Sequence, residues 1–112
     1  MDVLIDWERM PWDEPEGEPR PGYRCKTCVR DGQEVSLAEF SEGFVKEGWC
    51  EEGHLLYVLS GESTLRLKDG RVIHLRPGDT GILLAGEPHA HRMELAAGER
   101  ILILGFEQPQ AH

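Results

Sequence analysis

Two histidines stand two positions apart in the segment "GEPHAHRMEL", at His89 and His91. The segment reads as a β-strand, and alternate residues of a strand point to the same face, so both imidazoles could reach one point. Neutral imidazole is a common ligand for zinc, iron, nickel and copper. The pair therefore predicts half of a transition-metal site. The alternative interpretation is two exposed histidines on an edge strand near a turn.

A third histidine, His54, begins the apolar run "HLLYVL". Strand alternation puts Leu56 and Val58 on the same face as His54, so that if these two face a core, His54 does as well. Cys50, four residues earlier, would be a soft ligand for zinc or copper beside imidazoles. The alternatives are a core or rim histidine with both nitrogens hydrogen bonded, and a cysteine that acts as a small buried hydrophobe.

The loop around Cys50 also carries three glutamates, Glu47, Glu51 and Glu52. Their carboxylates offer oxygen ligands or general bases, and the alternative is that they are solvated.

Cys25 and Cys28 have the two-residue gap of zinc and redox motifs, but the chain contains no second pair of this kind. If their segment is a strand, the odd spacing sends the two side chains to opposite faces. We assign neither cysteine a role.

These candidate residues must be positioned by β-structure, because short apolar runs punctuated by Gly, Pro and Asp follow one another from residue 23 onward. Such a rhythm predicts an all-β antiparallel sandwich or barrel. In "STLRLKDGRVIHL" two alternating strands flank Asp69 and Gly70, which predicts a hairpin with a type I′ turn. The other expected strands cover 23–29, 34–41, 54–60, 80–84, 89–94 and 100–107.

The chain of 112 residues is expected to form one domain. Residues 1–22 contain a Pro-rich acidic stretch that cannot bury enough apolar surface to form a regular element, so an extended acidic N-terminal arm is expected there. Trp7 and Trp12 are its candidate anchors. Residues 23–112 are then the single β-barrel domain.

The charge balance, with 21 acidic against 12 basic side chains and a net charge of −9, disfavours nucleic acid and anionic membranes as partners. The N-terminus has neither the basic region nor the apolar run that a signal peptide or a membrane span needs. A cytoplasmic protein with three reduced cysteines is expected.

The order "GHLLYVLSGESTLRLKDGRVIHLRPGDTGILLAGEPHAH" resembles the cupin superfamily of small β-barrels, over roughly residues 34–107. The second cupin motif matches at Gly78, Gly86 and His89, with Leu84 in its proline position and Met93 in its asparagine position. "RPGD" and "AGEPH" are also similar to cupin sequences.

The first cupin motif matches only at its end, where "YVLSGE" makes Gly61 the last glycine. His54 then stands where cupins usually have a metal-binding glutamate. Cys50 and Gly48 stand in the two histidine positions, so the usual histidine pair is missing.

The resemblance implies a jelly-roll barrel, or double-stranded β-helix, with a metal site inside it. Its implied ligands are a mixed sulfur and nitrogen set, which favours Zn, Ni or Cu over the Fe of many carboxylate-containing cupin sites. These ligands are Cys50, His54, His89 and His91, and the expected substrate contacts are Glu47, Tyr57 and Met93.

Two functions follow from these observations, and the alternative to both is a barrel whose site has decayed, with the histidines filling its interior and the protein acting through its acidic arm or a dimer surface. The first is a single-domain cupin that binds a divalent transition metal and a small molecule, with any enzymatic reaction left open. The second is a non-catalytic small-ligand-binding or sensor module with a degenerate metal site. A homodimer is also expected, because a small sheet with exposed edges is protected by pairing with a second subunit.

Overall fold

The computed structural model describes residues 3–13, 20–45 and 48–107. Eight strands follow one another: β1 (Tyr23–Arg30), β2 (Gln33–Ser41), β3 (His54–Gly61), β4 (Ser63–Leu67), β5 (Val72–Leu75), β6 (Thr80–Leu83), β7 (His91–Glu94) and β8 (Arg100–Glu107). One turn of 3-10 helix, η1 (Glu87–His89), precedes β7. The predicted all-β class is confirmed.

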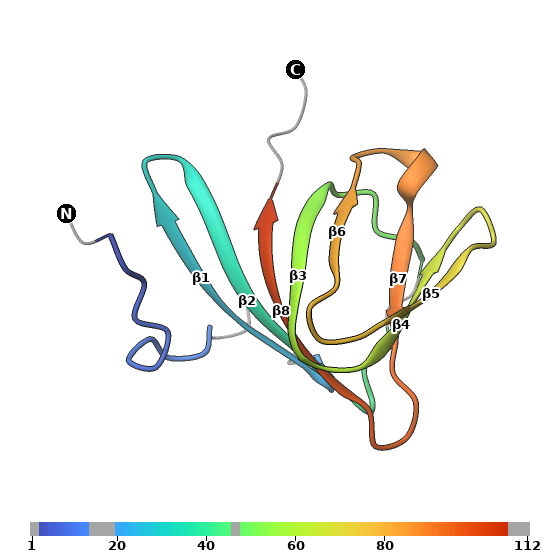
Figure 1. The fold of residues 1–112 in the computed structure, drawn as a ribbon, viewed down its shortest axis with the longest axis horizontal. Coiled ribbons are helices and arrows are strands. Elements are labelled where there is room, and N and C mark those ends of the chain that lie inside the picture. Colours follow the sequence, from blue (N-terminus) through green and yellow to red (C-terminus); the bar gives the residue numbers. More distant parts are fainter. Residues whose placement is uncertain (1–2, 14–19, 46–47, 108–112) are drawn as a thin grey trace.

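The strands form two antiparallel sheets that face each other in a jelly roll (Figure 1). One sheet has five strands in the order β1-β2-β8-β3-β6, and the other has three in the order β5-β4-β7. The core between them consists of alternate residues of the central strands, because successive strand side chains point to opposite faces. Its buried members are Leu56, Val58, Leu65, Leu67, Leu75, Leu83, Ile101 and Ile103.

The chain passes from one sheet to the other at Gly61, between β3 and β4. Gly61 has φ of +81°, and a Cβ atom there would overlap the carbonyl group of Arg100. Only glycine combines this backbone conformation with so close an approach of a second strand. The register of β3 against β8 also shifts between Val58 and Ser60, which bends the strand toward the second sheet.

The two Asp-Gly dipeptides of the chain adopt different turns. Asp69 is absent from the residues with positive φ, so the predicted type I′ turn at Asp69 and Gly70 is wrong. The amide of Gly70 donates to the carbonyl of Leu67, and Gly70 alone has positive φ, which is the three-residue loop of a type I turn followed by a bulge. At Asp31 and Gly32 both residues have positive φ, and the type I′ turn is found there.

The predicted strand over 89–94 was wrong at its beginning. Residues 87–89 form the 3-10 helix η1 with Pro88 inside it, and β7 starts only at His91. Proline fixes φ near −65° and has no amide hydrogen for a sheet ladder, so the strand cannot extend back through it.

Residues 3–13 lie beside β1, as Figure 1 shows in dark blue. The amide of Asp13 donates to the carbonyl of Cys25, and the Lys26 ammonium donates to the carbonyl of Trp7. The Trp12 ring lies against the cationic groups of Arg24 and Lys26. Residues 1–2 and 14–19 of the expected N-terminal arm lie outside the described residues, and the division at residue 22 stays a prediction.

All three cysteines are free thiols, and Cys25 and Cys28 pair with Ala38 and Val35 of β2, on alternate faces of the sheet as expected. None of the helices in the described ranges has the length and apolarity needed to cross a membrane.

Candidate functional site

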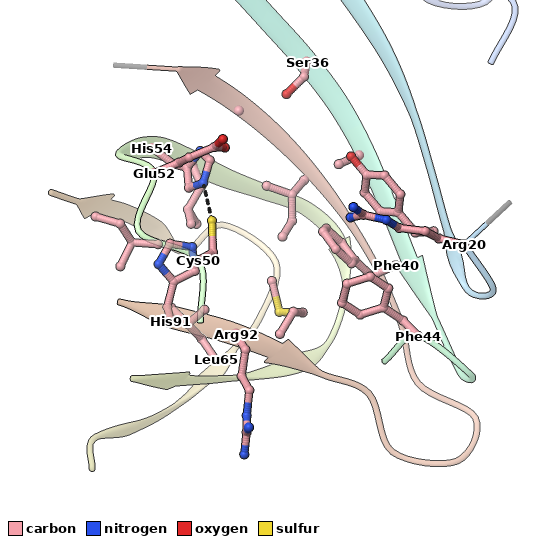
Figure 2. A pocket seen from close by; sticks show the side chains of 17 residues that line it. Arg20, Ser36, Phe40, Phe44, Cys50, Glu52, His54, Leu65, His91 and Arg92 are labelled. Atoms are coloured by element: carbon pink, nitrogen blue, oxygen red, sulfur yellow. Dashed lines mark hydrogen bonds between the residues drawn. The ribbon is translucent and has the colours of Figure 1, made fainter. Parts of the chain in front are cut away.

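A cavity of about 240 Å³ lies between the two sheets. Its polar end is lined by Cys50, Glu52, His54 and His91, and leucine, isoleucine and methionine side chains line its middle. The opposite end is aromatic, with one arginine, and Figure 2 shows these two ends facing each other across the cavity.

Cys50, His54 and His91 form a compact group at the polar end, hereafter the Cys-His-His cluster. One donor atom from each lies within 4.8 Å of the other two. Cys50 Sγ is 3.9 Å from His54 Nε2, the contact drawn in Figure 2, and the rings of His54 and His91 meet edge to face at a centroid distance of 5.4 Å. Thiolate and imidazole together are ligands typical of zinc and copper.

The cluster is assembled from both sheets. His54 is the first residue of β3 and pairs with Leu83 in the five-stranded sheet, while His91 is the first residue of β7 in the three-stranded sheet. Cys50 belongs to the loop before β3 and forms an isolated antiparallel bridge with His91. Two reciprocal backbone hydrogen bonds of 2.8 and 3.0 Å make this bridge. The loop that carries the thiol is thereby fixed to the strand that carries one imidazole.

A backbone hydrogen bond sets the tautomer of His91. Its Nδ1 atom lies 2.9 Å from the carbonyl oxygen of His89, and since a carbonyl can only accept, Nδ1 must be the donor. The lone pair of the neutral ring is then on Nε2. Histidine ligands of metals are commonly oriented in this way, by donating the other ring N–H to a backbone carbonyl. His91 is also only 7% exposed, so the surrounding residues restrict the orientations that its ring can adopt.

His89 is placed differently. It belongs to η1, and its Nδ1 atom accepts a hydrogen bond of 2.8 Å from the backbone amide of Leu84. In the neutral ring the proton is therefore on Nε2, and the Nδ1 lone pair is already used. The group of donor atoms within mutual 4.8 Å contains Cys50, His54 and His91 but not His89. The cluster thus contains His91, and not His89, which holds the histidine position of the second cupin motif.

Of the expected substrate contacts that the structure describes, one lines the cavity and one does not. Met93 lines the cavity, where its sulfur accepts a hydrogen bond from the Ser63 hydroxyl. Tyr57 is on the outer face of β3, 42% exposed, and does not line the cavity. Glu47 lies outside the described residues. Of the other two glutamates in that loop, Glu52 lines the cavity and Glu51 does not.

Sequence reasoning missed the aromatic end of the cavity, which is formed by Tyr23, Phe40 and Phe44 together with Arg20. Tyr23 and Phe40 are partners in the β1–β2 register, so the pairing of these two strands was the signal that could have found them. Phe44 and Arg20 follow and precede the paired strands, and no sequence pattern points to them.

A metal ion fits the Cys-His-His cluster. Tetrahedral zinc with bonds of about 2.3 Å to sulfur and about 2.05 Å to nitrogen separates its ligand atoms by roughly 3.4–3.6 Å. The contact of 3.9 Å between Cys50 and His54 needs a shift of only a few tenths of an ångström to reach that range. Three protein ligands would also leave a fourth coordination position, and all three residues line the cavity.

Residues 32–112 match the sequence profile of the AraC-like ligand binding domain. No curated protein matches the chain in sequence. Among solved structures, the polyketide cyclase RemF from Streptomyces resistomycificus is 20% identical, with a TM-score of 0.78 over 96% of this chain and 79% of that one. KdgF from Halomonas sp. is 20% identical, with a TM-score of 0.69 over 96% of this chain and 95% of that one.

An RmlC-like cupin from Shewanella frigidimarina is 17% identical, with a TM-score of 0.67 over 98% of this chain and 94% of that one. At these identities the similarity concerns the fold, and it agrees with the cupin resemblance of the sequence.

Proposed function

This chain belongs to the family of AraC-like ligand binding domains and to the cupin superfamily, and we propose that its barrel binds a small molecule beside a divalent transition metal ion. The metal is held by Cys50, His54 and His91. Zinc fits this sulfur and nitrogen set best, followed by nickel and copper. When bound, such an ion supplies a Lewis acid that polarises an oxygen atom of the small molecule.

The observation that carries the proposal is the convergence of three donor atoms within 4.8 Å at the cavity wall. The hydrogen bond from His91 to the His89 carbonyl supports it, because it occupies Nδ1 as a donor and leaves the lone pair of the neutral ring on Nε2, as in many metal-binding histidines. The bridge between Cys50 and His91 supports it further, because it holds two of the three residues in place before any ligand arrives.

The test is metal binding by the purified full-length chain. After removal of metals and titration with Zn²⁺, elemental analysis should give one zinc per chain. His54→Ala and His91→Ala should each weaken zinc binding by about 100-fold or more, because even second-shell changes cost roughly 10–100-fold. Cobalt in place of zinc should give a thiolate-to-metal absorption band that Cys50→Ser removes.

Cys28→Ser is the matched control, since Cys28 is a free, half-buried thiol on β1 that is not part of the cluster. It should leave both the zinc stoichiometry and the cobalt band unchanged. Wild-type protein that retains no zinc, or a Cys50→Ser protein with an unchanged cobalt band, would contradict the proposed site.

A second candidate function is binding of a small ligand without a metal, as a sensor barrel. It is favoured by the contact between Cys50 Sγ and His54 Nε2, because a thiol and an imidazole at 3.9 Å can satisfy each other. Ligand titrations of metal-free and zinc-loaded protein separate the two. Equal affinities would favour the sensor, and zinc-dependent affinity favours the first function.

A further inference from the structure

The end of the cavity opposite the Cys-His-His cluster carries three packed aromatic rings. The ring of Phe40 lies 5.0 Å from that of Tyr23 and 5.0 Å from that of Phe44, between centroids, with tilted and edge-to-face orientations. All three side chains line the cavity. Rings at these separations and tilts offer both faces and edges to a further ring, and each such pair contributes about 0.5–1.5 kcal/mol beyond its buried area.

The middle of the cavity is apolar. Leu56, Leu65, Leu83, Met93 and Ile103 line it, and four of these belong to the buried or nearly buried core. A polyhydroxylated sugar placed there would leave its hydroxyl groups without partners, which costs free energy for each buried group. The body of the ligand is therefore apolar, and the volume of about 240 Å³ is below the range of roughly 300–1,000 Å³ typical of drug-sized ligands. Both observations fit a single ring.

Two arginines line the cavity, and only one is available for a ligand. Arg92 donates to Glu94 and its guanidinium lies 4.6 Å above the Trp49 ring. Hydrogen bonds from Arg66, and then from Arg92, hold the pKa of the Glu94 carboxyl below its usual range. Figure 2 shows Arg92 directed away from the cluster.

Arg20 lies at the aromatic end, beside Phe40 in Figure 2 and across the cavity from the cluster. Within residues 3–13, 20–45 and 48–107, its guanidinium has no carboxylate partner. The positive charge of Arg20 nevertheless acts on Tyr23, which lines the same cavity. Burial raises the pKa of the Tyr23 hydroxyl, a hydrogen bond with Cys25 raises it further, and the positive charge of Arg20 acts in the opposite direction. A cation at the end of an apolar cavity, in a chain of net charge −9, is suited to an anionic group.

We propose that the small molecule is a single-ring aromatic carboxylate, with its ring against Phe40, its carboxylate on the Arg20 guanidinium, and an oxygen substituent at the far side of the ring directed to the Cys-His-His cluster. This inference rests on the proposed function for the role of that oxygen. The planar fork of arginine can bind a carboxylate in a bidentate manner, and the aromatic side chains at the same end of the cavity can pack against a flat ring.

The experiment is calorimetric titration of the zinc-loaded full-length protein with 4-hydroxybenzoate. Three comparison compounds are used: phenol has no carboxylate, cyclohexanecarboxylate has neither the aromatic ring nor the hydroxyl group, and glucose 6-phosphate is an anionic sugar. We expect 4-hydroxybenzoate to bind about tenfold more tightly than phenol, as one charge-assisted hydrogen-bonding contact at an exposed cation provides, and to bind more tightly than the two compounds that have no aromatic ring.

Arg20→Gln should weaken 4-hydroxybenzoate binding by about tenfold and leave phenol binding unchanged. Arg76→Gln is the matched control, because Arg76 is another exposed arginine but does not line the cavity. Phe40→Leu should weaken 4-hydroxybenzoate binding by roughly 2–10-fold and leave cyclohexanecarboxylate binding unchanged. Phe106→Leu, on the outer face of β8, is its control. Circular dichroism confirms that each variant is folded.

The inference is overturned if glucose 6-phosphate binds more tightly than 4-hydroxybenzoate, or if Arg20→Gln weakens binding no more than Arg76→Gln does. The zinc content of the same samples separates this failure from failure of the proposed function. If the protein takes up zinc but does not bind aromatic acids, only the proposed ligand class is contradicted. If the protein takes up no zinc, the proposed metal site is contradicted. Binding of 4-hydroxybenzoate that depends on Arg20 would then still support the proposed ligand class. If the protein binds neither zinc nor 4-hydroxybenzoate, both proposals are contradicted.

Discussion

His89 and His91 differ in the direction of one hydrogen bond at the same ring atom. Nδ1 of His91 donates to a carbonyl oxygen, whereas Nδ1 of His89 accepts from a backbone amide. The two rings therefore carry their protons on different nitrogens, although only Ala90 stands between them in the chain. This difference is a backbone property, since η1 ends at His89 and β7 begins at His91.

The first prediction concerns this pair. His89→Ala should keep one zinc per chain, because the carbonyl group that orients His91 belongs to the backbone and survives the substitution. It should lower the free energy of unfolding by about 0.5–1.5 kcal/mol, the usual net contribution of one hydrogen bond. Elemental analysis and urea denaturation measure both effects. Loss of zinc from His89→Ala to the degree seen in His91→Ala would show that His89 is itself a ligand.

The sequence was sufficient to place His54 but not His89. Alternation in "HLLYVL" puts His54 on the face of Leu56 and Val58, and both of these are buried. The same rule was applied to His89, where it does not hold because a 3-10 turn replaces the strand. The partnership of Cys50 with His91 joins residues 41 positions apart and depends on how the loop lies against β7, which no local pattern encodes.

At the scale of the elements, the chain crosses from the five-stranded sheet to the three-stranded sheet between β3 and β4. The strand alternation that predicted both strands correctly says nothing about the bend between them. Gly61 could be aligned to a cupin motif from sequence, but its reason is structural: the backbone of Arg100 lies where a side chain would be. The aromatic end of the cavity was predictable only in part: pairing of the two strands could have joined Tyr23 to Phe40, whereas Phe44 has the same sequence signature as an ordinary core residue.

The second prediction tests that bend. Gly61→Ala should destabilise the protein far more than Gly98→Ala, although the two glycines have nearly the same φ, +81° and +79°. Both variants incur about 1–2 kcal/mol for a left-handed backbone. Gly98 has open space around its Cβ position, whereas at Gly61 the clash with Arg100 adds roughly 1–3 kcal/mol.

Urea denaturation of the metal-free proteins compares the two free energies of unfolding. Equal losses would mean that the strands can separate at this corner without cost, and the close approach at Gly61 would then have no structural importance.

At the scale of the whole molecule, the outer face of the five-stranded sheet carries exposed apolar side chains over β8, β3 and β6. Tyr57 and Leu59 of β3, Ile82 of β6 and Phe106 of β8 are all exposed there on neighbouring strands. The strand that carries Ile82, β6, is also an edge strand of this sheet. Soluble monomers rarely expose contiguous apolar patches of this kind, and such patches commonly mark contact surfaces. The expected homodimer stays a prediction, and this face is where we propose that it forms.

The third prediction concerns that face. The protein should elute with a mass twice the chain mass of 12.7 kDa in size-exclusion chromatography with light scattering. Ile82→Glu should shift it to the monomer, because in a two-fold interface each change is introduced twice. Val29→Glu is a matched control, since Val29 is 62% exposed and Ile82 is 61% exposed, but Val29 lies at the far edge strand β1. A wild-type monomer at micromolar concentration would refute the dimer.

The bridge between Cys50 and His91 has a consequence for the dynamics of the barrel. His54 is carried by one sheet and His91 by the other, so a metal ion bound at the Cys-His-His cluster would cross-link the two sheets near the beginning of β3 and β7. Amide hydrogen exchange at Cys50 and His91, whose N–H groups bond to each other's carbonyls, would then slow together when the metal binds. The same contact that orients the ligands would thus report, through two amides, whether a metal ion is bound.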